Sequence, residues 1–244
     1  MSNLANNALD LGGDSNVSAT GGVVSYQENE VGVNAFAQGT IEVGLATDTP
    51  AVNTVNGSSV DVSGNSVSAL ALGNQSANDL TVEAGAGYRS LSAGASGTGT
   101  LTGGDARAEA SYAVLNGQTN SGPVSATVAD TTAGADFNGT GGTATVNGSS
   151  LTVANNSFSA TAVGNSATNR MTASARPAGN ASMALTSSQV NSGPVTASAN
   201  NVSVALGSGG VGTQATSSQV GGNSITASAT GNSVSNSMSA DGSL

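Results

Sequence analysis

The stretch GNSVSALALGNQSAN, residues 64–78, occurs three times in this chain in related forms. Residues 155–169 read NNSFSATAVGNSATN, and residues 222–236 read GNSITASATGNSVSN. A repeated unit of this kind does not bury its apolar face alone and stacks on its neighbours instead. The repeat therefore indicates an elongated, stacked architecture rather than a compact enzyme domain.

The repeat extends beyond this stretch. Residues 110–128 correspond to residues 181–199 at an offset of 71. At an offset of 91, four earlier residues (Gln27, Asn29, Val33 and Ala35) correspond to Gln118, Asn120, Val124 and Ala126. We divide the chain into a lead-in (1–24) and one repeat array (25–244) with units at about 25–109, 110–180 and 181–244. The first unit has an insert near 87–109, for which a loop or, preferably, one additional coil is expected.

A spacing of nine residues separates asparagines inside each unit, and each asparagine stands before a short run of alternating polar and apolar residues. Such alternation predicts half-buried strands. Asparagine and glycine suit the corners between strands because they tolerate positive φ. In stacked coils the same asparagines would also form hydrogen-bonded amide ladders. The residues expected in these turn or ladder roles are Asn56, Asn65, Asn74, Asn147, Asn156, Asn165, Asn223 and Asn232.

The apolar positions of the alternating runs predict a thin core, because many of them are alanine. No segment carries the apolar stripe of a helix, and glycine and asparagine are poor helix formers. We expect an all-β fold: a β-solenoid (β-helix) of three imperfect repeats with nine-residue subrepeats and about three strands per coil. A meander of short hairpins in a sandwich or barrel is the alternative. The expected core residues are Val67, Ala69, Ala71, Phe158, Ala160, Ala162, Ile225, Ala227 and Ala229.

Charged residues make up only 7 % of the chain, and the formal net charge is −10. An acidic surface disfavours nucleic acid and anionic lipid, and no apolar run approaches the ~20 residues of a membrane span. We therefore expect neither nucleic-acid binding nor membrane insertion. Asp79 and Arg170 stand at the same repeat position and would lie side by side if the units stack in register.

The chain has no histidine, cysteine or lysine, so the usual general bases, nucleophiles and zinc ligands are missing. We expect no catalytic residue, no metal site and no cofactor; for calcium there are only Gly-Gly-Asp fragments at 12–14 and 103–105. The remaining chemistry is that of carboxylates, as in polysaccharide-cleaving β-helices. The acidic residues are interpreted as solvated surface charge: Asp61, Asp79, Glu83, Asp105, Glu109, Asp130 and Asp136.

The segments GNSVSALALGNQSANDLTV and GNSITASATGNSVSN resemble bacterial surface fibre and adhesin repeats. Gln27, Gln118 and Gln189 are similar to the ladder-forming glutamines of curlin-type repeats, although the spacing differs and the units are longer. In character the chain is closer to holdfast anchor proteins. It also resembles the heads of trimeric autotransporter adhesins, without their coiled-coil stalk and anchor. The resemblance implies a bacterial cell-surface or extracellular role in attachment, biofilm or fibre formation.

We therefore expect a structural, non-enzymatic surface protein, with a polysaccharide-binding or polysaccharide-cleaving β-helix as the alternative. Both ends of the array read as strand material without a protective charge cluster or proline, which predicts self-association into filaments or docking to another surface protein. The alternative is that residues 1–10 fold over the first edge and keep the protein monomeric. Extracellular polysaccharide is a further expected partner. Residues 1–15 lack the basic start and apolar centre of a signal peptide, so the export route is not indicated.

Overall fold

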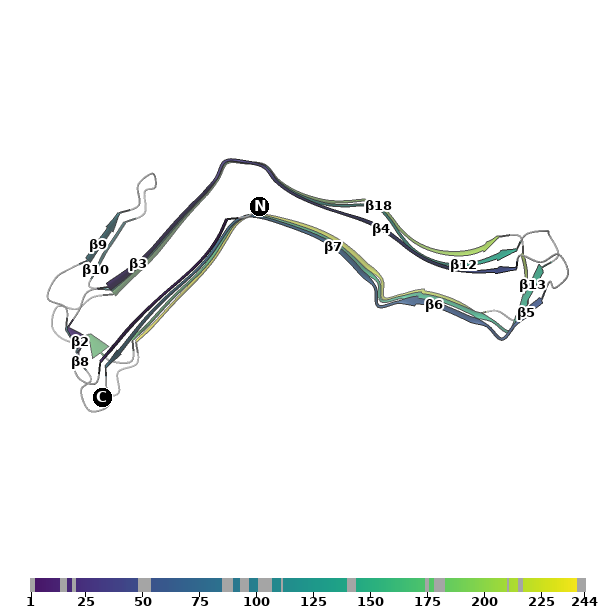
Figure 1. Ribbon diagram of the computed structural model, residues 1–244, viewed down its shortest axis with the longest axis horizontal. Helices are drawn as coiled ribbons and strands as arrows, with labels where there is room; N and C mark the ends of the chain where they lie inside the picture. Colours follow the sequence, from purple (N-terminus) through teal and green to yellow (C-terminus); the bar gives the residue numbers. More distant parts are fainter. Residues whose placement is uncertain are drawn as a thin grey trace.

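The computed structural model describes residues 3–13, 17–18, 21–47, 54–84, 90–92, 97–100, 107–110, 112–139, 144–173, 176–177, 183–209, 211–214 and 217–240. These residues form an all-β structure (Figure 1). Within the described ranges there is no helix that could serve as a membrane span.

The longest strands belong to three sheets. They are β1 (Asn3–Gly13), β3 (Gly21–Asn29), β4 (Val33–Thr47), β7 (Ser66–Ala84), β11 (Tyr112–Asn120), β12 (Val124–Gly139), β15 (Ser157–Ala173), β17 (Met183–Asn191), β18 (Val195–Gly209) and β21 (Ser224–Ala240). Shorter strands connect or extend them: β2 (Val17–Ser18), β5 (Thr54–Asn56), β6 (Ser59–Ser63), β8 (Ser90–Ser92), β9 (Gly97–Thr100), β10 (Arg107–Ala110), β13 (Ala144–Asn147), β14 (Ser150–Ala154), β16 (Arg176–Pro177), β19 (Val211–Gln214) and β20 (Ser217–Gly221).

Parallel pairing stacks the chain in three tiers, which we define as β3–β7, β11–β15 and β17–β21. Four three-stranded sheets have the orders β17-β11-β3, β18-β12-β4, β19-β13-β5 and β20-β14-β6, and a four-stranded sheet has the order β1-β7-β15-β21. Figure 1 looks along the stack, so that equivalent strands of the tiers superimpose on one another. The second tier is therefore the middle one, and the arrangement is consistent with a β-solenoid.

The repeat offsets found in the sequence are the registers of the pairing. Gln118 pairs with Gln27 and Val124 with Val33, each 91 residues apart, and Gln189 pairs with Gln118 at 71 residues. Each tier runs out along one layer, turns at a corner and returns along a second layer, which gives the flat, arched outline of Figure 1. Side chains between the two layers form the core.

Left-handed backbone marks the corners that precede the short strands β6 and β14 and those that follow β6, β14 and β20. Gly57 and Gly148 have φ of 65° and 60°. At the next corner Gly64, Asn155 and Gly222 have φ of 69°, 56° and 66°. These conformations cost little for glycine and are tolerated by asparagine, which is why those residues recur there.

The nine-residue subrepeat is wrong as a description of strand length. Asn74 was expected at a corner, but β7 continues through it over 19 residues, and β15 and β21 are 17 residues long. Gly73 and Asn74 are both buried, so the inward-facing phase of the strand changes between them. The Asn74 side chain therefore points into the interior, where its amide has hydrogen-bond partners. The strand continues through this position without a turn.

Besides a small cluster of Ala113, Leu115 and Ala184, the buried residues form two apolar segments and one polar segment. The larger apolar cluster contains Val60, Val124, Leu151 and Phe158, and the other contains Leu80, Tyr112, Val114 and Met171. Buried amides and hydroxyls lie on the strand segments between them: Ser25, Gln27, Asn29, Asn74, Ser76, Asn78, Asn116, Gln118, Asn120, Asn165 and Asn169.

Burial decreases from the middle tier outward, and this corrects part of the expected core. Phe158, Ala160 and Ala162 are fully buried, Ala69 and Ala71 are buried, and Val67 is partly buried. By contrast, Ile225, Ala227 and Ala229 are exposed, although they pair with Phe158, Ala160 and Ala162. Their side chains take inward positions, but no described residue covers the outer side of the third tier.

The insert of the first unit and the lead-in both differ from the expected structure. The insert near 87–109 contains the antiparallel hairpin of β9 and β10 and a strand, β8, that pairs with β2 and β16. Residues 3–13 of the lead-in form β1, which pairs with Asn74–Ala84 of β7. β1 thus adds a partial tier outside the first one.

Candidate functional site

Side-chain amides connect the tiers through the buried polar segment. Asn3 Nδ2 donates to Asn74 Oδ1 at 2.9 Å, Asn74 Nδ2 donates to Asn165 Oδ1 at 2.8 Å, and Asn165 Nδ2 donates to Asn232 Oδ1 at 2.8 Å. The second amide proton of Asn74 reaches the carbonyl oxygen of Thr119 at 2.8 Å. This ladder therefore satisfies buried amides in both directions, which a single tier could not do.

Four further ladders repeat this arrangement. One runs from Asn7 through Asn78 and Asn169 to Asn236, with amide bonds of 2.8 Å. The others have three members each: Asn65, Asn156 and Asn223; Asn29, Asn120 and Asn191; and Gln27, Gln118 and Gln189.

All ladders have a direction. In each asparagine ladder the Nδ2 group donates toward the third tier, whereas in the glutamine ladder Gln189 donates to Gln118 and Gln118 to Gln27. At the third tier the asparagine ladders therefore end in N–H donors and the glutamine ladder ends in an acceptor oxygen. At the opposite end of the stack the asparagine ladders end in acceptor oxygens and the glutamine ladder ends in an N–H donor. The two ends of the stack are complementary.

The predicted asparagines fall into two groups. Asn65, Asn74, Asn156, Asn165, Asn223 and Asn232 are ladder members. Asn56 and Asn147 are paired through their backbones at a corner, and both side chains are exposed. Sequence reasoning did not select Asn78, Asn169 and Asn236, although each is the last residue of the three repeats quoted above. It also missed Asn3 and Asn7, whose spacing of four matches that of Asn74 and Asn78.

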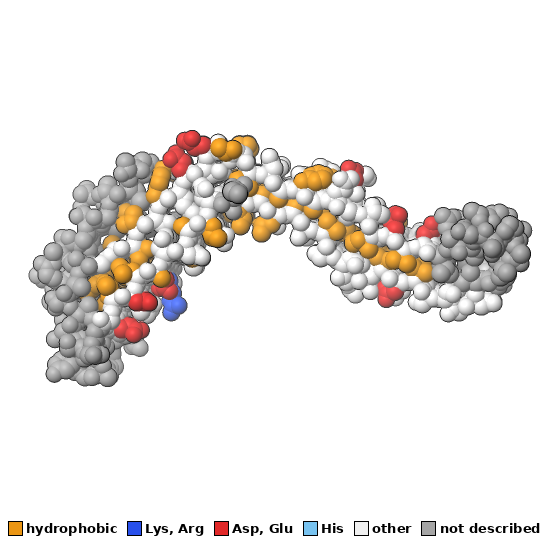
Figure 2. All heavy atoms as spheres, in the orientation of Figure 1, with side chains coloured by type: hydrophobic (Ala, Val, Ile, Leu, Met, Phe, Trp, Pro, Cys, Tyr) orange, Lys and Arg blue, Asp and Glu red, His pale blue; other side chains and the backbone are white. Residues whose placement is uncertain are grey.

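The two end faces of the stack are open sheet edges among the described residues. On the third tier, Ile225 is 50 % and Met238 57 % exposed, whereas their partners Phe158 and Met171 on the middle tier are 0 % exposed. Figure 2 views the stack end-on and shows a band of hydrophobic side chains along the middle of the molecule, with Asp and Glu side chains at its margins. The carboxylates show that this view does not look onto the third tier, which has no charged residue. An edge of this kind presents unpaired backbone groups and apolar surface together.

Charge is distributed unevenly between the two end faces. The third tier, Met183–Ala240, contains no charged residue. Carboxylates are found instead on β1 and the first tier: Asp10, Glu28, Glu30, Glu42, Asp61, Asp79 and Glu83. One end of the molecule is therefore acidic and the other neutral. Asp79 of β7 and Arg170 of β15 are partners in the backbone pairing of these two strands, on adjacent tiers.

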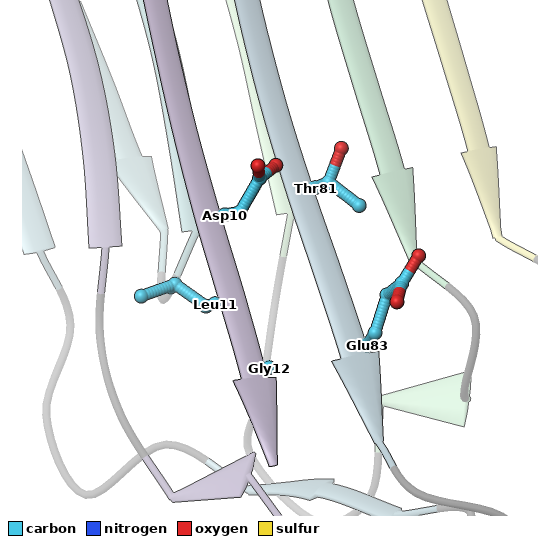
Figure 3. Close-up of a pocket in the computed structure, with 5 residues that line it drawn as sticks. All are labelled: Asp10, Leu11, Gly12, Thr81 and Glu83. Atoms are coloured by element: carbon cyan, nitrogen blue, oxygen red, sulfur yellow. The ribbon is translucent and has the colours of Figure 1, made fainter.

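The carboxylates considered for chemistry do not share one groove. Figure 3 shows a surface hollow where Asp10 of β1 lies beside Thr81 of β7, with Glu83 further along β7 and Leu11 turned away. Asp61 lies on β6, and Asp130 and Asp136 lie on β12. The Glu109 side chain and Asp105 are outside the described residues, as are Asp14 and residues 103–105 of the calcium-motif fragments. Within the described part of the chain, no three acidic residues are grouped to hold a metal ion.

Comparison of the chain with known protein families, characterised proteins and solved structures finds no match. The amide ladders and the two open edges are therefore the features on which a functional proposal depends.

Proposed function

We propose that this chain is a β-solenoid that acts as a structural, non-enzymatic subunit of an extracellular bacterial surface assembly, as a fibre subunit or an attachment anchor. The observation that carries the proposal is the pair of open end faces. Their strands follow the same pairing register, and their amide ladders end in complementary groups. Stacking one copy on another would continue the pairing that already joins the tiers.

Burial favours this association. Ile225 and Met238 are about half exposed in the single chain, and a stacked copy would bury them as Phe158 and Met171 are buried. Complete burial of a side chain of this size contributes about 1.5–3 kcal/mol, so half of it is a substantial gain at several positions together. Backbone groups along the same edges would gain their missing partners.

The polarity of the ladders favours open filaments over closed dimers. If two third tiers met face to face, the donor ends at Asn232 and Asn236 would oppose donor ends of the same kind. Two acidic first-tier faces would bring carboxylates together, which is also unfavourable. Head-to-tail contact avoids both problems, and a heterologous contact that does not close generates a fibre.

Composition supports a structural rather than a catalytic role on the cell surface. The chain contains no histidine, cysteine or lysine, and its carboxylates are spread over β1, β6, β7 and β12. A surface rich in Ser, Asn, Thr and Gly with few charges suits stacked strands. The resemblance to surface fibre and adhesin repeats points to the same role.

A charge placed on the third-tier edge tests self-association. Ala227→Asp puts a carboxylate at an inward position that stacking would bury, whereas Ser228→Asp puts the same charge at the neighbouring outward position. We expect the unmodified chain and the Ser228→Asp variant to form concentration-dependent filaments in sedimentation and negative-stain microscopy. The Ala227→Asp variant should remain monomeric because a buried unpaired charge is costly. Globular monomers of the unmodified chain at every concentration would refute the proposal.

A further inference from the structure

β1 occupies a place on β7 that matches a segment at the other end of the chain. Through the pairing registers, Asn3, Asn7, Leu9 and Leu11 are equivalent to Asn232, Asn236, Met238 and Ala240. β1 is thus a copy of the second half of β21, placed on the opposite end face of the stack.

The contacts that β1 makes are those that β21 of a second copy could make. Asn3 Nδ2 donates to Asn74 Oδ1 at 2.9 Å and to the Glu28 carbonyl oxygen at 2.6 Å. Asn232 has its Nδ2 group at the outer end of the same ladder, where its one acceptor among the described residues is the Gln189 carbonyl oxygen at 3.4 Å. Asn236 stands in the same relation to Asn7, whose Nδ2 donates to Asn78 Oδ1 at 2.8 Å. The donor polarity is the same in both segments.

As long as β1 is paired with β7, the two end faces of neighbouring copies cannot make contact along their whole length. While β1 is paired with β7, a second copy can stack its β21 only on β1, and its β17, β18 and β20 remain one further strand spacing away from β3, β4 and β6. If β1 leaves, all of these strands can pair. β1 has 11 residues, whereas β21 has 17, and β3, β4 and β6 add 9, 15 and 5 residues of new pairing.

We propose that head-to-tail assembly proceeds by strand exchange, in which residues 232–240 of one copy replace β1 of the next copy on β7. This inference rests on the proposed function, because it names the partner, a second copy of this chain, and the register of the contact. Exchange stabilises the assembly because the pairing gained along the whole face exceeds the pairing lost with β1. In the isolated chain, β1 covers that part of the edge of β7.

Two double-cysteine variants of the full chain distinguish exchange from stacking with β1 in place. The natural sequence has no cysteine, so each introduced pair is unique. In the Ala77→Cys/Ser235→Cys variant, the two positions are separated by Thr168 on the middle tier. Their Cα atoms are therefore roughly 9–10 Å apart in one chain, which is too far for a disulfide. In an exchanged assembly, position 235 of one copy lies beside position 77 of the next.

The Asn6→Cys/Ser235→Cys variant is the matched control. Asn6 pairs with Ala77, so position 6 meets position 235 of another copy only if β1 stays on β7. All three positions are exposed, and the outward side chains do not belong to the ladders. Both variants are allowed to assemble under reducing conditions, are then oxidised, and are analysed on denaturing, non-reducing gels, with sedimentation as the measure of assembly.

Exchange predicts a series of covalent oligomers for the 77/235 variant and none for the 6/235 variant. The reverse pattern would overturn exchange and leave self-association intact. Assemblies that sediment but contain no cross-link in either variant would also overturn it. If the unmodified chain and both variants stay monomeric, the proposed function fails, and the exchange proposal fails with it.

Discussion

Asn74 and Asn165 are 91 residues apart in the sequence, and a buried hydrogen bond of 2.8 Å joins Asn74 Nδ2 to Asn165 Oδ1. Asn165 is also the donor to Asn232 Oδ1 and to the Val190 carbonyl oxygen, both at 2.8 Å. A side chain so placed connects all three tiers. The stability of the stack should therefore depend strongly on this one residue.

Removal of the middle ladder amide tests that dependence. Asn165→Ala leaves the Asn74 donor without its acceptor in the interior, and we expect the free energy of unfolding to fall by about 2–3 kcal/mol. The control is Asn232→Ala on the exposed third tier, which should cost less than about 1 kcal/mol in the monomer. Urea denaturation at monomeric concentration measures both; equal losses would show that the ladder is not a buried, energetically distinct feature.

Overpacking of the thin core provides a second test. Ala160 is fully buried between Ala69 and Ala227, its partners on the neighbouring tiers. We expect Ala160→Leu to lower the free energy of unfolding by about 1–3 kcal/mol, because added methyl groups have no space there. Ala227→Leu, on the exposed tier, should leave the monomer nearly unchanged. An unaltered thermal midpoint for Ala160→Leu would contradict the assigned inward phase of β15.

Tyr112 should give the protein a dependence on alkaline pH. Its side chain is fully buried, and burial raises the pKa of the phenol above its ordinary value of 10.0. The folded state then holds the phenolic proton more tightly than the unfolded chain does. This contribution to stability is complete below about pH 10 and is lost as pH rises through the folded-state pKa. Denaturation of Tyr112→Phe should show a weaker decline of stability above pH 10; identical profiles would exclude this origin.

The same substitution should stabilise the protein near neutral pH. The described residues offer the Tyr112 hydroxyl oxygen no hydrogen-bond partner although it is buried. Replacing it by Phe removes a polar group that lost its hydration on folding, and we expect a gain of about 1 kcal/mol in the free energy of unfolding at pH 7. A loss of stability would show that the hydroxyl has a partner after all.

The corner glycines should be sensitive to backbone conformation alone. Gly64 has φ of 69°, and a Cβ added there would meet nothing within 4 Å. Gly64→Ala should therefore cost about 1–2 kcal/mol, the cost of a left-handed conformation for an L-residue. The control is Gly39→Ala, where the same space is free and φ is not positive; it should be neutral or slightly stabilising. Equal effects in thermal unfolding would contradict this reason for the corner.

The all-β class and the pairing of distant segments were accessible from the sequence because the repeats carry the register directly. The offset that relates Gln27 to Gln118 is the offset at which they pair. The same reasoning placed Asp79 opposite Arg170. Local alternation also identified most inward positions of the middle tier, such as Phe158 and Ala160.

Other features depended on context that local patterns do not contain. Asn74 has the sequence neighbours of a corner residue, but its amide is satisfied by Asn165 and the Thr119 carbonyl, so the strand continues. Ile225 has the pattern of a core residue, and only its place on an outer tier leaves it exposed. That residues 1–10 fold over the first edge was the alternative from the sequence, and β1 does cover part of that edge. Its register on β7 was not predicted, because just two asparagines and two leucines relate β1 to the repeat.

Mass per unit length of the assembled filaments tests the central claim most directly, that copies stack along the direction in which the tiers pair. Each chain of 23.0 kDa contributes three tiers if β1 is exchanged, so we predict one chain per about 14 Å of filament from a strand spacing of about 4.8 Å. Scanning transmission electron microscopy of unstained filaments gives this value. One chain per about 19 Å would mean that β1 remains as a fourth rung. A repeat much longer than that, or chains that never form filaments, would contradict the account.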